Sequence, residues 1–251
     1  MKTFSFSRLK LYQTCPKRFY YKYILEREEP VTKPLALGKA VHKAIEEMIN
    51  GDSLENAIQK GWIDADFHPE VTGTEIKQLV KKAPIHKEMG KTEQYFRFPL
   101  DDSPYSPYIQ GYIDLVQESE FGVTVSDWKT NWKTYDIRDN HQVALYALAI
   151  QHLKGVNEVK GRLAFLRYGK ESNHIFDRDD TEQARQWALQ LANKINSKLS
   201  ILDIMPEKAD ELFPVAPSSA CSHCPFVLEC FRNFSQYSLQ NNGGFKNEKN
   251  V

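Results

Sequence analysis

The sequence predicts an α/β protein whose small mixed sheet is wrapped by helices. Two observations support this prediction. Apolar residues recur with helical spacing before residue 90 and after residue 180. Between these regions, short stretches rich in aromatic and β-branched residues are typical of strands, and one helical stretch lies among them.

The composition is that of a folded globular chain. The 251 residues are 41% hydrophobic and 12% aromatic, which is enough for a sizeable core and excludes a disordered protein. The longest apolar run, Val143–Ile150, is far shorter than the roughly 18–20 residues of a membrane-spanning helix. The N-terminus lacks the apolar segment of a secretory signal, so we expect a cytoplasmic protein without a membrane partner. The 33 basic and 33 acidic residues cancel, and zero net charge, taken alone, argues against nucleic acid as a ligand.

The first part of the chain is expected to be helical. Ser7 can cap a helix that runs to Cys15, and Pro16 then stops or kinks it. A helix over 38–49 has its apolar residues at helical spacing, with Gly51 as its C-terminal cap. Two further helices are expected at 53–61 and 70–88.

The later part alternates between strands and helices. Strands are expected at 93–100, 108–117, 122–129, 158–167 and 174–176, and helices at 139–153 and 181–204. The polar, Gly/Asn-rich segment 235–251 is expected to be a disordered tail.

The stretches 108–117 and 122–129 predict a hairpin that brings two acids together. If its turn lies at Glu120–Phe121, antiparallel pairing sets Asp114 directly opposite Asp127, with Cβ atoms roughly 4.5–5.5 Å apart. Like charges at that distance destabilise a sheet unless a cation lies between them. Lys129 shares a face with Asp127 because side chains alternate along a strand.

Two acids and a lysine in this arrangement suit a Mg²⁺-type ion that also binds a phosphate. The alternative is an ordinary solvent-facing hairpin in which the two acids pair with Lys129. His42 on the 38–49 helix, and Gln142 and Tyr146, spaced i, i+4 on the 139–153 helix, favour the functional interpretation when taken together.

Five motifs in this order resemble the RecB-like nuclease domains of the PD-(D/E)xK superfamily. The similar segments are FSFSRLKLYQTCPKRFYY (4–21), GKAVH (38–42), GYID (111–114), DWK (127–129) and QVALY (142–146). The opening segment resembles the iron–sulfur members, which include CRISPR-associated exonucleases of spacer acquisition and the nuclease domains of bacterial helicase–nuclease complexes.

The resemblance implies a restriction-endonuclease-like core that hydrolyses DNA phosphodiester bonds with Mg²⁺ or Mn²⁺. It implies that the metal ligands are His42, Asp114, Asp127 and the main-chain carbonyl of Trp128. Lys129 would be the catalytic lysine. Gln142 and Tyr146 would contact the DNA strand or order the site. Some relatives carry one more acid, for which Glu93 is the nearest candidate.

Four cysteines predict a second metal site. Cys15 stands near the N-terminus, and Cys221, Cys224 and Cys230 form a C-x2-C-x5-C cluster. By number of ligands they suit Zn²⁺ or an iron–sulfur cluster equally well. The resemblance favours a [4Fe–4S] cluster, with Zn²⁺ as the alternative and His223 as a substitute ligand.

Such a site would join both ends of the chain, and we therefore expect a single nuclease domain. The predicted domain covers residues 1–234. Within it we expect an iron–sulfur clasp formed by Cys15 with 219–232, a helical insertion at 35–90 and a catalytic sheet region at 93–178.

The N-terminal segment is basic although the whole chain is neutral. Residues 1–25 hold six lysines and arginines, no acid, and several interleaved aromatic residues. This composition predicts a nucleic-acid-binding surface, with Arg8, Lys17 and Arg18 as phosphate contacts and Tyr146 as a contact nearer the predicted metal site.

The predicted function is a metal-dependent DNA exonuclease acting on single strands or DNA ends, in repair, recombination, phage biology or CRISPR adaptation. A helicase, recombination or CRISPR protein would be its partner. The alternative is a non-catalytic DNA-end-binding or assembly subunit with the same fold. An ATP-driven motor is disfavoured because the P-loop-like Gly90-Lys91-Thr92 has Ile85 where the first glycine belongs.

Overall fold

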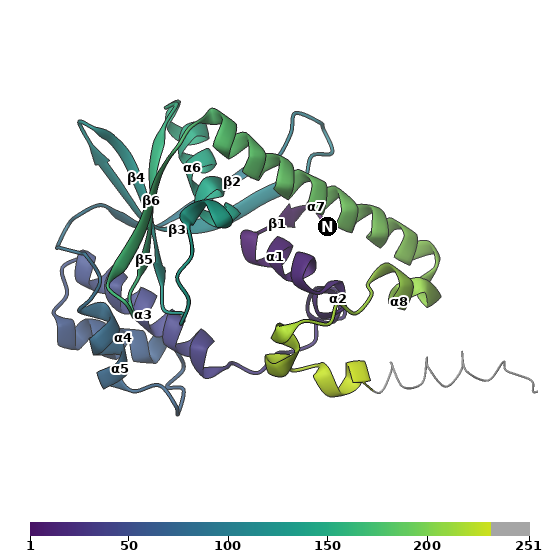
Figure 1. Cartoon of the computed structure of the whole chain (residues 1–251), viewed down its shortest axis with the longest axis horizontal. Helices are drawn as coiled ribbons and strands as arrows, with labels where there is room; N and C mark the ends of the chain where they lie inside the picture. The colour runs from purple at the N-terminus through teal and green to yellow at the C-terminus, as the bar shows by residue number, and fades with distance from the viewer. Residues whose placement is uncertain (232–251) are drawn as a thin grey trace, which may run out of the picture. The chain divides into compact units, whose positions relative to one another are not determined.

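The computed structural model describes residues 1–231, in two compact units (Figure 1). The first unit comprises residues 1–9 and 31–197, and the second comprises residues 10–30 together with the described residues from 198 onward. Helices α1 (Phe6–Thr14) and α7 (Arg178–Ile204) each contribute residues to both units. The single domain over 1–234 stays a prediction, and the expected tail at 235–251 lies outside the described residues.

The first unit contains a mixed sheet of six strands. Its strands are β1 (Thr3–Phe4), β2 (Lys91–Pro99), β3 (Tyr108–Ser119), β4 (Gly122–Lys129), β5 (Val159–Phe165) and β6 (Lys170–Phe176). They run in the order β1-β3-β4-β5-β6, and β2 also pairs with β3. Strand β1 is parallel to β3 and β4 is parallel to β5, whereas the other pairs are antiparallel. The predicted α/β class with a small mixed sheet is confirmed.

The β3–β4 hairpin has the register expected from its short turn. Ser119 pairs with Gly122 and Leu115 pairs with Ser126. Gly122 has φ +114°, a conformation that glycine adopts without steric strain. One step beyond the last paired residues, the same register sets Asp114 opposite Asp127.

Helices cover the sheet and hold its position. In the view of Figure 1, α3 (Lys33–Ile49), α4 (Leu54–Asp64) and α5 (Gly73–Val80) group below the strands, and α6 (His141–Lys154) lies on their other side. The first group shares a hydrophobic core with Leu115, Trp128, Ala164 and Leu166 of the sheet region. Helix α6 packs on β4 and β5.

Two helices differ most from their expected bounds. The helix expected at 38–49 begins earlier, at Lys33, where Thr32 is the N-cap and proline occupies the first turn. The helix expected at 70–88 is only α5, which ends at Val80. Pro84 lies beyond it, and proline together with the residue before it disfavours a continuing helix.

The second unit is joined by aromatic packing between its two chain segments. Its helices are α2 (Pro16–Tyr23) and α8 (Ala209–Leu212), with short 3-10 turns at 206–208 and 219–223. Phe213 is fully buried and lies against Phe19 and Tyr20, with ring centroids 6.3 and 5.2 Å apart. Buried Lys17 pairs with Asp210. Within residues 1–231, no helix has the length and apolar character needed to cross a bilayer.

The packing of α3 against α4 depends on a close approach at Gly61. A Cβ atom at this position would collide with the carbonyl oxygen of Ala40, whereas one at Gly73 would meet Ile58 at an ordinary 3.5 Å. The backbone of α3 therefore leaves no room for a side chain at Gly61.

We expect Gly61→Ala to lower the free energy of unfolding by at least about 1 kcal/mol, because overpacking outweighs the gain in helix propensity. Urea unfolding measures this change. Gly73→Ala is the matched control and should be neutral or slightly stabilising. Equal stability of the two variants would contradict the close packing.

Candidate active site

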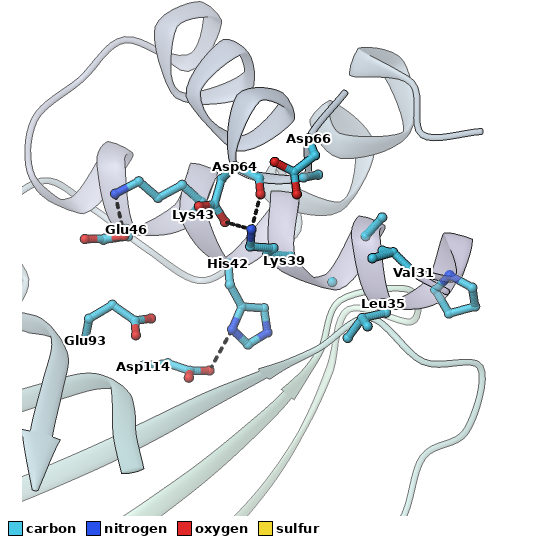
Figure 2. A pocket seen from close by; sticks show the side chains of 14 residues that line it. Val31, Leu35, Lys39, His42, Lys43, Glu46, Asp64, Asp66, Glu93 and Asp114 are labelled. Atoms are coloured by element: carbon cyan, nitrogen blue, oxygen red, sulfur yellow. Dashed lines mark hydrogen bonds and ion pairs between the residues drawn. The ribbon is translucent and has the colours of Figure 1, made fainter. Parts of the chain in front are cut away.

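The opposed carboxylates of the hairpin meet an imidazole from α3. His42 Nδ1 lies 3.3 Å from Asp114 Oδ2, and His42 Nε2 lies 2.8 Å from the carbonyl oxygen of Trp128 (Figure 2 shows His42 directed at Asp114). The Trp128 N–H donates to the same carboxylate oxygen of Asp114 over 2.9 Å. The site therefore joins one helix to both strands of the hairpin.

A chain of polar contacts leads from Asp127 to α6. Lys129 Nζ lies 2.6 Å from Asp127 Oδ2 and donates to Gln142 Oε1 over 2.7 Å. Gln142 Nε2 donates in turn to the hydroxyl of Tyr146 over 2.8 Å. Asn140 caps α6 by accepting from the Gln142 N–H, which fixes the start of the helix beside the lysine.

Burial and charge act in opposite directions on these groups. Burial raises the pKa of Asp127 above its usual value, although nearby Lys129 opposes the shift. For Asp114 burial acts in the same direction and is the largest single effect, but the charge and hydrogen bond of His42, the Trp128 N–H and the charge of Lys129 together outweigh it and lower the pKa. Burial would lower the pKa of His42, yet Asp114 raises it to about 9. Burial would lower the pKa of Lys129, but Asp127, together with Tyr135 and Asp114, raises it. The two cationic side chains are thus counter-ions to the two carboxylates.

A third carboxyl group lies beside this pair. The register of β2 on β3 sets Glu93 opposite Asp114, and the backbone of Glu93 has φ +48°, which is uncommon outside glycine. Burial, followed by the charge of Asp114, raises the pKa of Glu93 to about 7. From the sequence Glu93 is only a candidate extra acid, because the register of its strand is not determined there.

An open cavity of about 810 Å³ runs along α3 past these groups. His42, Asp114 and Glu93 line it together with Lys39 and Lys43 (Figure 2). Both lysines have acidic partners: Lys39 lies 3.7 Å from Asp64, and Lys43 lies 2.6 Å from Glu47. The cavity gives a polar ligand access to His42 and Asp114.

The family described as the PD-(D/E)XK nuclease superfamily matches residues 3–230. This chain belongs to the PD-(D/E)XK nuclease superfamily. A search of curated proteins finds no match. One similar solved structure, titled "Crystal structure of SSO0001", has a TM-score of 0.44 and 12% identity, covering 92% of this chain and 86% of that one.

Membership in the superfamily confirms the predicted family and agrees with the expected restriction-endonuclease-like fold. It makes the chain a nuclease in general terms, and divalent metals such as Mg²⁺ or Mn²⁺ are usual in the superfamily. The RecB-like and iron–sulfur subtypes stay predictions.

The ligand atoms around Asp114 and Asp127 are of the kinds that bind a hard divalent cation. Carboxylate and carbonyl oxygens are the ligands that Mg²⁺ and Mn²⁺ prefer, and imidazole is a common additional ligand. Asp114 and Asp127 supply carboxylates, His42 supplies an imidazole 3.3 Å from Asp114, and Trp128 supplies a carbonyl oxygen 2.8 Å from His42. Within residues 1–231, no three His, Cys, Asp or Glu side chains are grouped in an arrangement that could hold a metal ion.

The four cysteines of this PD-(D/E)XK chain line one cavity of the second unit. Its volume is about 210 Å³, and its wall includes Arg18 and apolar side chains such as Phe226. Ser218 N–H donates to the sulfur of Cys221 over 3.4 Å. Burial raises the pKa of both Cys224 and Cys230. The four thiols therefore share a cavity without forming, in the described residues, a metal-holding group.

The predicted nucleic-acid contacts near the N-terminus are mostly engaged within the protein. Arg8 donates to the carbonyl oxygen of Thr3 over 3.0 Å. Lys17 is buried against Asp210, and Arg18 lies 2.7 Å from Glu29. Several of the interleaved aromatic side chains belong to the core: Phe4, Tyr12, Phe19 and Tyr21 are buried. A role for Arg8, Lys17 or Arg18 in binding DNA stays a prediction.

Proposed function

We propose that this protein is a divalent-metal-dependent deoxyribonuclease that removes nucleotides from single-stranded DNA or DNA ends. The observation that carries the proposal is the pair of opposed carboxylates, Asp114 and Asp127, flanked by Lys129 and His42 in a PD-(D/E)XK chain. The proposal includes a cytoplasmic location. It also includes a helicase, a recombination protein or a CRISPR protein as partner.

The residues of the site have distinct roles in it. His42, Asp114, Asp127 and the Trp128 carbonyl would hold Mg²⁺ or Mn²⁺, with Glu93 as an additional acid beside them. When bound, such an ion lowers the pKa of a coordinated water and polarises the phosphoryl oxygen. Lys129 places its ammonium beside the scissile phosphate, where it orients the attacking water and stabilises the negative charge that develops.

Gln142 and Tyr146 act on Lys129. Gln142 accepts from the ammonium and fixes its direction, and Tyr146 lies at hydrogen-bonding distance from the amide of Gln142. Because Tyr146 is buried and its pKa is raised well above its usual value, its hydroxyl keeps its proton. Its position supports ordering of the site more directly than contact with the DNA strand.

The cleavage assay uses linear and circular single strands of one sequence, and linear duplexes, with Mg²⁺ or Mn²⁺. We expect the linear single strand to be shortened from an end and the circle to resist. Lys129→Ala and Asp114→Asn should each slow cleavage at least about 100-fold, because the first removes the ammonium beside the reacting phosphate and the second removes a proposed metal ligand.

Lys194→Ala, on the exposed side of α7, is the matched control and should cleave at the parental rate. Cleavage that survives both site variants would contradict the assignment. Metal-independent binding to DNA ends without any cleavage would support the non-catalytic alternative instead. A circle cut as fast as the linear strand would make the enzyme an endonuclease.

We further propose that Cys15, Cys221, Cys224 and Cys230 hold a [4Fe–4S] cluster, with Zn²⁺ as the alternative. What supports this is that all four thiols line one cavity and come from both segments of the second unit. A cluster there would close a very long loop of chain and remove entropy from the unfolded state. His223 is exposed and does not line the cavity, which disfavours it as a ligand.

Anaerobically purified protein should be brown and contain iron and labile sulfide in matching amounts. Cys15→Ser should lose both, because three remaining thiolates ligate the cluster poorly. His223→Ala is the control and should retain both. Colourless protein that contains zinc and no iron would establish the alternative.

A further inference from the structure

Trp132 is exposed to solvent and lies just beyond the end of β4 in the first unit. Its side chain is 72% exposed, whereas Trp62 is 38% exposed and Trp128 is 2% exposed. It follows Lys129 by three residues, a stretch that spans at most about 11 Å. An exposed large aromatic residue at that distance from a proposed reacting centre calls for a physical explanation.

Hydrogen bonds hold the backbone of the segment that carries Trp132 in place. Leu166 N–H donates to the Lys129 carbonyl over 2.9 Å, and Arg167 Nε donates to the Thr130 carbonyl over 2.6 Å. The hydroxyl of Tyr168 donates to the Trp132 carbonyl over 2.7 Å. These bonds tie the segment to the turn between β5 and β6, so the indole is held in an exposed position.

The guanidinium of Arg167 lies over one face of the indole. Its central carbon is 3.9 Å from the ring centroid, a cation–π arrangement. With 72% of the side chain exposed, the other parts of the ring stay open to solvent. Arg167 thus fixes the tilt of the ring and adds positive charge behind it.

The surroundings of Trp132 are positively charged. Lys82 donates to the Arg167 carbonyl over 2.8 Å, and Lys133 is exposed beside the tryptophan. Among the described residues, neither these two lysines nor Arg167 forms an ion pair with an acid. This contrasts with Lys39 and Lys43 in the cavity along α3, which have acidic partners.

The segment also adjoins that cavity. The side chain of Thr130 lies next to Gly38, at 3.5 Å from where a Cβ would stand, and Gly38 lines the cavity with His42. A strand whose phosphate lies at Lys129 could therefore place a neighbouring nucleotide against Trp132.

We propose that Trp132 is a stacking platform for an unpaired base of the nucleic-acid strand, with Arg167, Lys133 and Lys82 drawing its phosphates to this side of the site. This inference rests on the proposed nuclease function. A flat aromatic ring beside cations that lack acidic partners is the combination that binds single strands without sequence preference, because every base has a π-face. A base inside a duplex is covered on both faces and cannot stack there without leaving its neighbours, so the platform selects single strands or duplex ends.

The test measures binding of a fluorescent single-stranded oligonucleotide to the full chain carrying Lys129→Ala, which is expected to bind without cutting in Mg²⁺. Adding Trp132→Ala should weaken binding by about tenfold, since stacking of one base contributes roughly that much. Trp132→Tyr should restore most of the affinity. Phe121→Ala, at the 92% exposed tip of the hairpin, is the matched control and should bind like the parent.

An abasic scan identifies the nucleotide involved. One abasic position in the oligonucleotide should weaken binding to the parent, but have no further effect on the Trp132→Ala variant. The thermal unfolding temperature should fall only slightly, because the hydrogen bonds that hold the segment do not use the indole and only the contact with Arg167 is lost. If Trp132→Ala unfolds, Trp132→Gln keeps bulk without the aromatic face and should show the same loss.

The outcomes separate the two proposals. If the chain with Lys129 intact neither binds nor cuts nucleic acid, the proposed function fails. If the chain binds and cuts nucleic acid, but Trp132→Ala binds as tightly as the parent, only the stacking platform is overturned. The same conclusion follows if every abasic oligonucleotide weakens binding to the parent by the same factor.

Discussion

Two carboxylates face one another across adjacent strands at Asp114 and Asp127, and the other residues of the candidate active site are arranged around that repulsion. Like charges directly opposite in a sheet are destabilising, and here Asp127 is also fully buried. The structure offsets this cost with His42 against one acid and Lys129 against the other. A divalent cation is the further positive charge that such a pair can accept.

Two helices on either side of the sheet position those counter-charges: α3 carries His42 itself, and α6 holds Lys129 of β4 through a neutral amide. Helix α3 brings His42 to Asp114, and α6 brings Gln142 to Lys129. Neither contact is local in sequence, so both depend on the packed core beneath them. The close crossing at Gly61 and the buried Trp128 belong to that core, which links packing far from the site to its geometry.

A feature of the fold or the candidate site could be predicted from the sequence only where nearby residues determine it. The β3–β4 register followed from the short turn before Gly122, and therefore the facing acids were predicted correctly. The position of Glu93 was not, because β2 and β3 are joined through residues 100–107, where no tight turn determines the register. The composition of the N-terminal segment predicted a nucleic-acid-binding surface. Composition cannot distinguish an exposed aromatic ring from one that is buried against Phe213. Trp132 carried no signal in the sequence, because its exposure and its stacking on Arg167 arise from the turn between β5 and β6.

The most direct test of the central claim is metal binding at the opposed carboxylates, measured without catalysis. Chain freed of metal with EDTA is titrated with Mn²⁺, following thermal stability and the electron paramagnetic resonance of free Mn²⁺. At a concentration 100 times the dissociation constant, the native state should gain about 2.7 kcal/mol. Asp114→Asn should abolish this gain, and Asp203→Asn, on the exposed side of α7, should preserve it. Equal Mn²⁺ binding by the Asp114 variant, or no stabilisation of the parent, would contradict the account.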